Sequence, residues 1–177
     1  MPNKPPPRCT ACGEPQRVVR TTTDYPESGL DNVQLVNVPM WQCPNGHQEL
    51  QVPAADQLHA LLTDMVLRKP AKLTGQEIRF LRKELAMTLH EFSGRLGMTD
   101  VHLSRIETGN RPMISSATNL LVRLTVAWEL TRQDRIPFPR DLEPVVDELE
   151  QTWDIGSHRL RHRDGSPPDR RWEQATP

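Results

Sequence analysis

The stretch from Leu73 to Pro112 reads LTGQEIRFLRKELAMTLHEFSGRLGMTDVHLSRIETGNRP. It contains two capping boxes, TGQE at 74–77 and TLHE at 88–91, and each is a sequence pattern that begins a helix. Gly97 closes the second of these helices. Thr99 is placed to cap a third, short helix that ends at Gly109. The stretch therefore predicts short helices joined by a tight glycine turn.

Two short helices joined in this way, with further helices packed around them, form the helix-turn-helix that reads DNA. The second helix of such a pair lies in the major groove and presents its N-terminal residues to base edges. The residues expected at the bases are Asp100, Val101, His102 and Arg105. Those expected near phosphates are Thr88, Thr99, Ser104, Asn110 and Arg111. A plain helical domain is the alternative, since periodicity alone fits both.

The charge of this stretch is close to balanced. It holds six basic and five acidic side chains, a net charge of +1. Phosphate attraction from so small a charge is weak, so we expect affinity to depend on dimerisation and on the flanking residues Arg68, Lys69 and Lys72. Arginine can bond both acceptors of guanine, so we expect Arg105 to carry most of the sequence preference.

The same forty residues resemble the helix-turn-helix of phage repressors of the Cro/CI (XRE-like) type. The resemblance is carried by MTLHEFSGRLGM in the second helix and SRIETGNRP after the recognition helix. It implies a buried pair between Arg82 and Glu107 that braces the motif. Leu89 departs from the pattern, because a glutamine that touches phosphate is usual there.

Cysteine and histidine form a second pattern near the N-terminus. Cys9 and Cys12 make a CxxC pair, and Cys43 and His47 lie four apart in CPNGH. Three sulfurs and one nitrogen suit a tetrahedral zinc ion, and four protein ligands leave no open position, so the site would be structural. Three free thiols are the alternative. A catalytic Cys–His pair has no oxyanion site or acid–base partner beside it, so no enzymatic activity is expected.

The remaining sequence predicts an α+β protein, with a small zinc-stapled antiparallel β module followed by an all-α repressor-like domain. Strands are expected at 16–23, 32–38 and 47–52, and an amphipathic helix at 54–67. Leu120, Leu121, Leu124 and Trp128 fall on one side of a helix that begins at Ser115 or Ser116. The expected divisions are a disordered tail 1–8, the zinc module 9–53, helix and linker 54–72, the helix-turn-helix domain 73–132, a linker and C-terminal helix 133–155, and a disordered tail 156–177.

Both modules together resemble the MqsA/YgiT-type antitoxins. CTACGE (9–14), VPMWQCPNGH (38–47) and the segment from Leu73 stand where the family has its motifs. Gly46 stands where the family has its fourth cysteine, with His47 next to it, and Val101 aligns with a base-contacting asparagine. The resemblance implies a type II antitoxin that binds a ribonuclease toxin and represses its own operon. It also implies a homodimer on a palindrome with half-sites about 34 Å apart, and residues 116–130 in the dimer interface.

A zinc-finger/helix-turn-helix transcription regulator with no toxin partner is the alternative. The chain of 177 residues has a net charge of −1, so its overall charge does not indicate nucleic-acid binding. The N-terminal MPNKPPPR lacks the apolar run of a signal peptide, and no stretch is long and apolar enough to span a membrane. We therefore expect a cytosolic protein.

Overall fold

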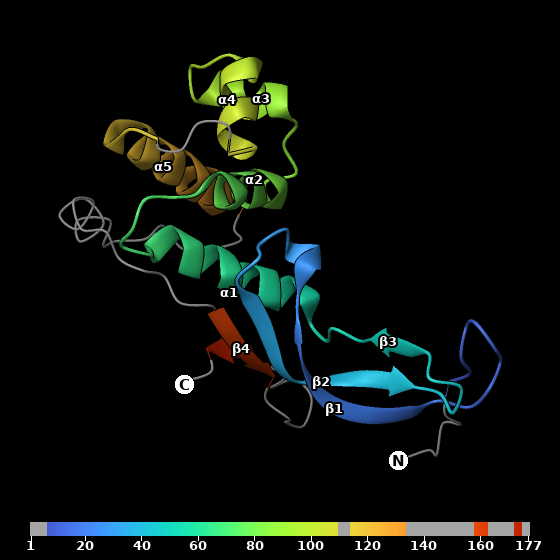
Figure 1. Ribbon diagram of the computed structural model, residues 1–177. Helices are drawn as coiled ribbons and strands as arrows, with labels where there is room; N and C mark the ends of the chain where they lie inside the picture. Colours follow the sequence, from blue (N-terminus) through green and yellow to red (C-terminus); the bar gives the residue numbers. More distant parts are fainter. Residues whose placement is uncertain (1–6, 110–113, 134–157, 163–171, 175–177) are drawn as a thin grey trace. The chain divides into compact units, whose positions relative to one another are not determined.

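The structure is a computed structural model that describes residues 7–109, 114–133, 158–162 and 172–174. The chain divides into two units. A β unit comprises Met1–Tyr25, Asn32–Gln57 and Ser157–Pro177, and a helical unit comprises Pro26–Asp31 and Leu58–Gly156. The fold is therefore α+β, as the sequence predicts (Figure 1).

The β unit is built on two long antiparallel strands, β1 (Arg17–Asp24) and β2 (Val33–Gln42). The short strand β3 (Gln48–Leu50) pairs with the second half of β2. The register of β1 and β2 shifts between Thr21 and Thr23, and Asn37 on β2 has a φ of 60° there. This is the geometry of a β-bulge, in which one extra residue bends the strand. The three expected strands are present, and β2 is longer than expected.

The segment expected to be a disordered tail, 156–177, contains two strands. β4 (His158–His162) pairs in parallel with Val33–Val36 of β2, and β5 (Trp172–Gln174) pairs antiparallel with β4. Because β3 covers only the second half of β2, its first half offers unpaired backbone groups at the same edge. Backbone pairing at such an edge needs no apolar side chains, so a polar, arginine-rich sequence can form a strand there.

Helix α1 (Ala55–Arg68) belongs to the helical unit from Leu58 onward. The unit also contains α2 (Gly75–Glu84), α3 (Leu89–Arg95), α4 (Asp100–Glu107) and α5 (Ser116–Arg132). The 3₁₀ turn Pro26–Ser28 also belongs to it. Both predicted capping boxes are present with their reciprocal hydrogen bonds, and Thr99 and Ser115 cap α4 and α5. The core consists of the apolar sides of these helices, including Leu62, Leu81, Phe92, Leu103 and Val126.

A buried polar network fixes α1 and its following loop to the other helices. The fully buried Arg123 on α5 donates hydrogen bonds to the backbone oxygens of Leu67 and Ala71. Lys69 Nζ lies 2.5 Å from Glu77 Oε2, and both side chains are buried. Burial lowers the pKa of Arg123 to about 10, so the guanidinium still carries its charge at neutral pH. Residues 58–72 belong to the helical unit.

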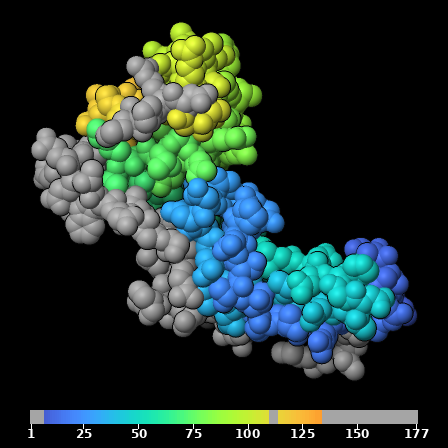
Figure 2. Space-filling model, viewed as in Figure 1, coloured from blue at the N-terminus to red at the C-terminus, as the bar shows by residue number. Residues whose placement is uncertain are grey.

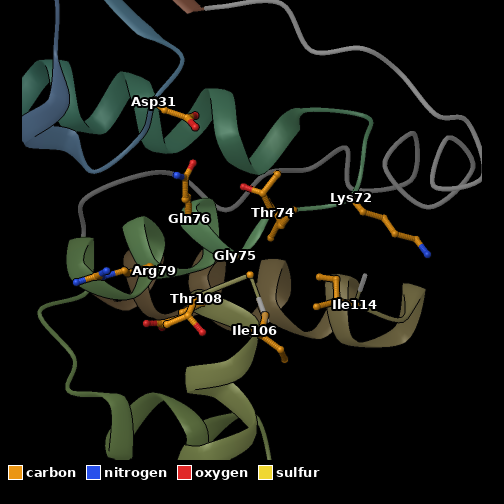
Figure 3. A pocket seen from close by; sticks show the side chains of 12 residues that line it. Asp31, Lys72, Thr74, Gly75, Gln76, Arg79, Ile106, Thr108 and Ile114 are labelled. Carbon is orange, nitrogen blue, oxygen red and sulfur yellow. The ribbon is translucent and has the colours of Figure 1, made fainter. Parts of the chain in front are cut away.

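The start of α2 lies directly against the end of α4. A Cβ built on Gly75 would stand 2.1 Å from the backbone oxygen of Ile106. A pocket of about 760 Å³ opens beside this contact, and Thr108 and Ile114 form part of its wall (Figure 3). Gln76 and Asp31 both line this pocket, and the Gln76 amide nitrogen, when turned toward the Asp31 carboxylate, donates to it at 3.1 and 3.2 Å. Only glycine permits the close approach of the two helices.

The C-terminal helix expected around 141–153 lies outside the described residues. Among the helices that the structure does describe, none combines the length and the apolar character needed to cross a bilayer.

We predict that Gly75→Ala lowers the free energy of unfolding by about 1–3 kcal/mol, because the new methyl group meets backbone that cannot rotate away. Gly94→Ala is the matched control, since Gly94 lies on α3 and a Cβ there has no neighbour within 4 Å. That change should be neutral or stabilising by up to about 1 kcal/mol. Urea unfolding of the two variants tests this, and equal stabilities would refute the proposed close packing of α2 on α4.

Candidate metal centre and nucleic-acid interface

The four residues predicted to bind a metal come together in the β unit. Cys9 and Cys12 lie on a turn in which the amide of Gly13 donates to the Cys9 oxygen. Cys43 and His47 lie on the turn between β2 and β3, where the Cys43 amide donates to the His47 oxygen. The ligand atoms of these four residues all lie within 4.8 Å of one another. In the described part of the chain this is the one such cluster of three or more ligand-type side chains.

The distances between these atoms fit a tetrahedral metal site. The sulfurs of Cys12 and Cys43 are 3.7 Å apart, and His47 Nδ1 lies 3.7 Å from Cys9 Sγ and 3.4 Å from Cys43 Sγ. Metal–sulfur bonds of about 2.3 Å and metal–nitrogen bonds of about 2.0 Å place neighbouring tetrahedral ligands roughly 3.5–3.8 Å apart. The displacement of the fourth ligand from position 46 to 47 therefore leaves room for an ion. The cluster is able to hold the sheet together through a metal.

The local electrostatics differ between the thiols. A hydrogen bond from the backbone of Glu14, helped by His47 and Asn45, lowers the pKa of Cys12 to about 6. Burial raises the pKa of Cys43. One ligand is therefore largely thiolate at neutral pH before a metal arrives, and a cation would favour deprotonation of the others.

We predict one tightly bound metal ion per chain, measured by elemental analysis after dialysis. Cys9→Ser or His47→Ala should remove it and unfold the β unit, because this small sheet has few apolar side chains in its core. His47→Cys should retain the ion, since a thiolate replaces one nitrogen ligand. His90→Ala, which changes an exposed histidine of the helical unit, is the control. Metal content unaffected by His47→Ala would exclude His47 as a ligand.

In the helical unit, α3 and α4 are joined by a turn that requires its glycine. Gly97 has a φ of 63°, a backbone conformation that side chains disfavour. The amide of Met98 donates to the Ser93 oxygen across this turn, which satisfies the end of α3. This segment lies on the outer surface of the helical unit, in yellow-green (Figure 2). Its geometry is that of two short helices with a tight connection.

The residues expected to contact DNA fall into three groups. Val101 and Arg105 are exposed on α4, while His102 and Ser104 are partly buried. Thr88 and Thr99 are exposed, and their hydroxyls accept the helix-capping hydrogen bonds. Asn110 and Arg111 lie outside the described residues. The structure therefore leaves Arg105 and Val101 as the expected base-reading side chains with the most accessible surface.

Asp100 is engaged within the protein. Ser93 Oγ donates to its Oδ1 at 2.5 Å, and His90 Nδ1 lies 3.1 Å from its Oδ2. The hydrogen bond from Ser93, with a smaller contribution from His90, lowers the pKa of this carboxyl. In this structure Asp100 therefore ties the start of α4 to α3, and its expected contact with bases stays a prediction.

The Arg82–Glu107 pair implied by the resemblance is present. Arg82 donates from Nε and Nη2 to the two carboxylate oxygens at 2.7 and 2.8 Å, and from Nη1 to the backbone oxygen of Met87 at 3.0 Å. The pair joins α2 to α4. The hydrogen bond from Glu107 raises the pKa of Arg82.

Sequence reasoning missed several buried ionic groups. Lys69 was expected near phosphate, but it is buried against Glu77 and is not available to DNA. Glu129 on α5 is buried and binds Arg95 of α3 and Arg132. Neither Arg123 nor Glu129 carries a local sequence signal of burial, because the backbone oxygen of Leu67 and the side chain of Arg95 that they bind lie in other segments.

Of the four apolar residues expected on one side of α5, Leu120 is half-buried and the other three are exposed. Leu121, Leu124 and Trp128 are exposed, and the Trp128 residue is 62% exposed. The opposite side, with Val122, Val126 and Leu130, packs into the core.

No protein-family model matches this chain. Searches of the curated proteins and of the solved structures found no match either.

Proposed function

We propose that this protein is a sequence-specific DNA-binding transcriptional repressor. The observation that carries the proposal is the exposed face of α4. Arg105 stands there with no ion-pair partner among the residues that the structure describes. The opposite side of α4 is held by Leu103, Ile106 and the Arg82–Glu107 pair. A helix fixed from behind, with a cation aimed outward, suits entry into the major groove.

We predict that Arg105→Ala weakens binding to a preferred duplex by about 10- to 100-fold, because a bidentate contact to guanine contributes roughly 1–3 kcal/mol. Binding to random duplex should fall much less. Arg17→Ala, which removes the same charge from the exposed surface of the β unit, should leave the preference unchanged. Fluorescence anisotropy at fixed salt measures both, and circular dichroism checks the fold. Unchanged discrimination in the Arg105 variant would remove this residue from the interface.

We infer that the Cys₃His cluster binds zinc, with a structural role. Three soft thiolates and one imidazole in a tetrahedron select zinc over magnesium or calcium, which prefer oxygen. The cluster offers four ligand atoms, which would fill the tetrahedral coordination of a bound zinc ion. Zinc would then stabilise the β unit and leave no position for a substrate.

The exposed apolar side of α5 supports a homodimer as the DNA-binding form. Leu121, Leu124 and Trp128 are the exposed large apolar side chains that the structure describes in the helical unit outside α4. Two copies joined through this side would bury them and present two copies of α4 to a palindrome. Dimerisation would also double the phosphate contacts of a motif with little net charge.

We predict that Trp128→Glu halves the mass observed in sedimentation equilibrium, because a buried carboxylate would face an apolar partner surface. Val18→Glu places the same charge on an exposed apolar position of β1 and should leave the mass unchanged. An unaltered mass for the Trp128 variant would show that the exposed side of α5 is not the dimer interface.

We further propose that the protein acts as a type II antitoxin, in which the β unit binds a ribonuclease toxin. The support is the co-occurrence of a Cys₃His-bearing sheet with the α3–α4 pair in one chain, together with the resemblance of the motifs. The regulator without a toxin partner shares these features, so the neighbouring gene decides between them.

The antitoxin function predicts that a small protein encoded beside this gene co-purifies with the full chain and arrests growth when expressed alone. Co-expression of the chain should restore growth. The Arg105→Ala variant should also restore it, since the DNA-binding face is not needed for toxin binding, whereas Cys9→Ser should not. Growth arrest that persists when the wild-type chain is co-expressed would contradict the antitoxin function and leave the transcription regulator as the proposed function.

A further inference from the structure

Two residues of α4 and its C-cap residue Thr108 share one exposed face. Val101, Arg105 and Thr108 follow one another at spacings of four and three, which places them in one row along a helix. The buried residues Leu103, Ile106 and Glu107 occupy the other side. The Val101 residue is 60% exposed, more than any other large aliphatic residue in the described part of the chain.

Neither packing nor helix formation accounts for a valine here. Its side chain lies largely in solvent, so its burial contributes little to stability. Valine is also a weaker helix former than alanine, leucine or the long polar residues, because its branched Cβ restricts the side chain. We therefore explain the apolar side chain beside the exposed Arg105 by a molecule that binds to this surface.

The carboxylate of the neighbouring Asp100 is held by other residues of the protein and does not compete with Val101 for contact with a base. Asp100 uses its carboxylate oxygens to accept from Ser93 and to contact His90, both on α3. A carboxylate that turned to a base would accept from the amino group of cytosine. Because this one is held within the protein, the first turn of α4 offers the base edges a branched apolar group.

We propose, on the basis of the DNA-binding function above, that Val101 reads the 5-methyl group of a thymine in the major groove. Thymine is the one standard base that presents a methyl group there. Arg105 lies four residues further along α4, a rise of about 6 Å. Base pairs are stacked about 3.4 Å apart. The thymine therefore lies within two base pairs of the guanine that Arg105 contacts.

The test begins with duplexes selected from a random library by the full-length wild-type protein at fixed salt. Each thymine of a selected duplex is then replaced singly by deoxyuridine, which removes the methyl group and keeps the pairing. We expect one replacement per half-site, within two base pairs of a guanine, to weaken binding about fourfold, the value of one buried methyl-sized group. Replacements elsewhere should change the dissociation constant less than about twofold.

The variant arm couples this effect to the side chain. In Val101→Ala the same thymine-to-deoxyuridine change should cost clearly less than fourfold, because the two γ-methyl groups of the valine are removed. Val18→Ala, which shortens an exposed valine on β1, should retain the fourfold loss. Circular dichroism establishes that each variant is folded, and the scan with wild-type protein needs no variant at all.

The outcomes separate the two proposals. If the library yields no enriched duplex, the DNA-binding function fails. Enriched duplexes that show no methyl dependence, or whose methyl dependence persists undiminished in Val101→Ala, overturn the thymine contact and leave the DNA-binding function standing.

Discussion

Arg82 and Glu107 share two hydrogen bonds between α2 and α4, and the same guanidinium holds the backbone oxygen of Met87 in the turn that leads to α3. One side chain thus fixes three segments at once. Removing either partner would leave a largely buried charge without its counter-ion, a loss of about 3–5 kcal/mol in comparable sites. The orientation of α4, and with it the direction in which Arg105 faces, depends on this pair.

Local chemistry explains why the helix starts were predictable. A threonine hydroxyl and a glutamate three residues later satisfy the free amides of the first turn. The four residues 74–77, and likewise 88–91, are therefore enough to predict the start of a helix. The metal cluster was predictable for a related reason. Two ligands close together on each of two turns can meet around one ion wherever the strands bring those turns together.

What remained hidden depends on distant partners. Helix α5 has apolar residues on two sides, so periodicity alone does not tell whether Leu124 or Val126 faces the core. Arg123 is buried because the carbonyl groups at the end of α1 require donors, a need that lies in another part of the sequence. Strand β4 forms by backbone pairing with β2, and the side-chain pattern of β4 does not predict a strand. The role of Asp100 likewise depends on Ser93 across the turn.

The pairing of β4 with β2 has a consequence for synthesis on the ribosome. Residues 17–50 form the first three strands of the sheet, and residues 158–174 form the last two. Most of the helical unit lies between these two segments in the sequence. Until β4 emerges, the first half of β2 has one edge that the nascent chain cannot yet cover. The helical unit can form its own contacts during this interval, whereas the sheet is completed last. Fragments that end before residue 158 would thus carry an N-terminal sheet with a permanently open edge, the kind of surface that joins one chain to another.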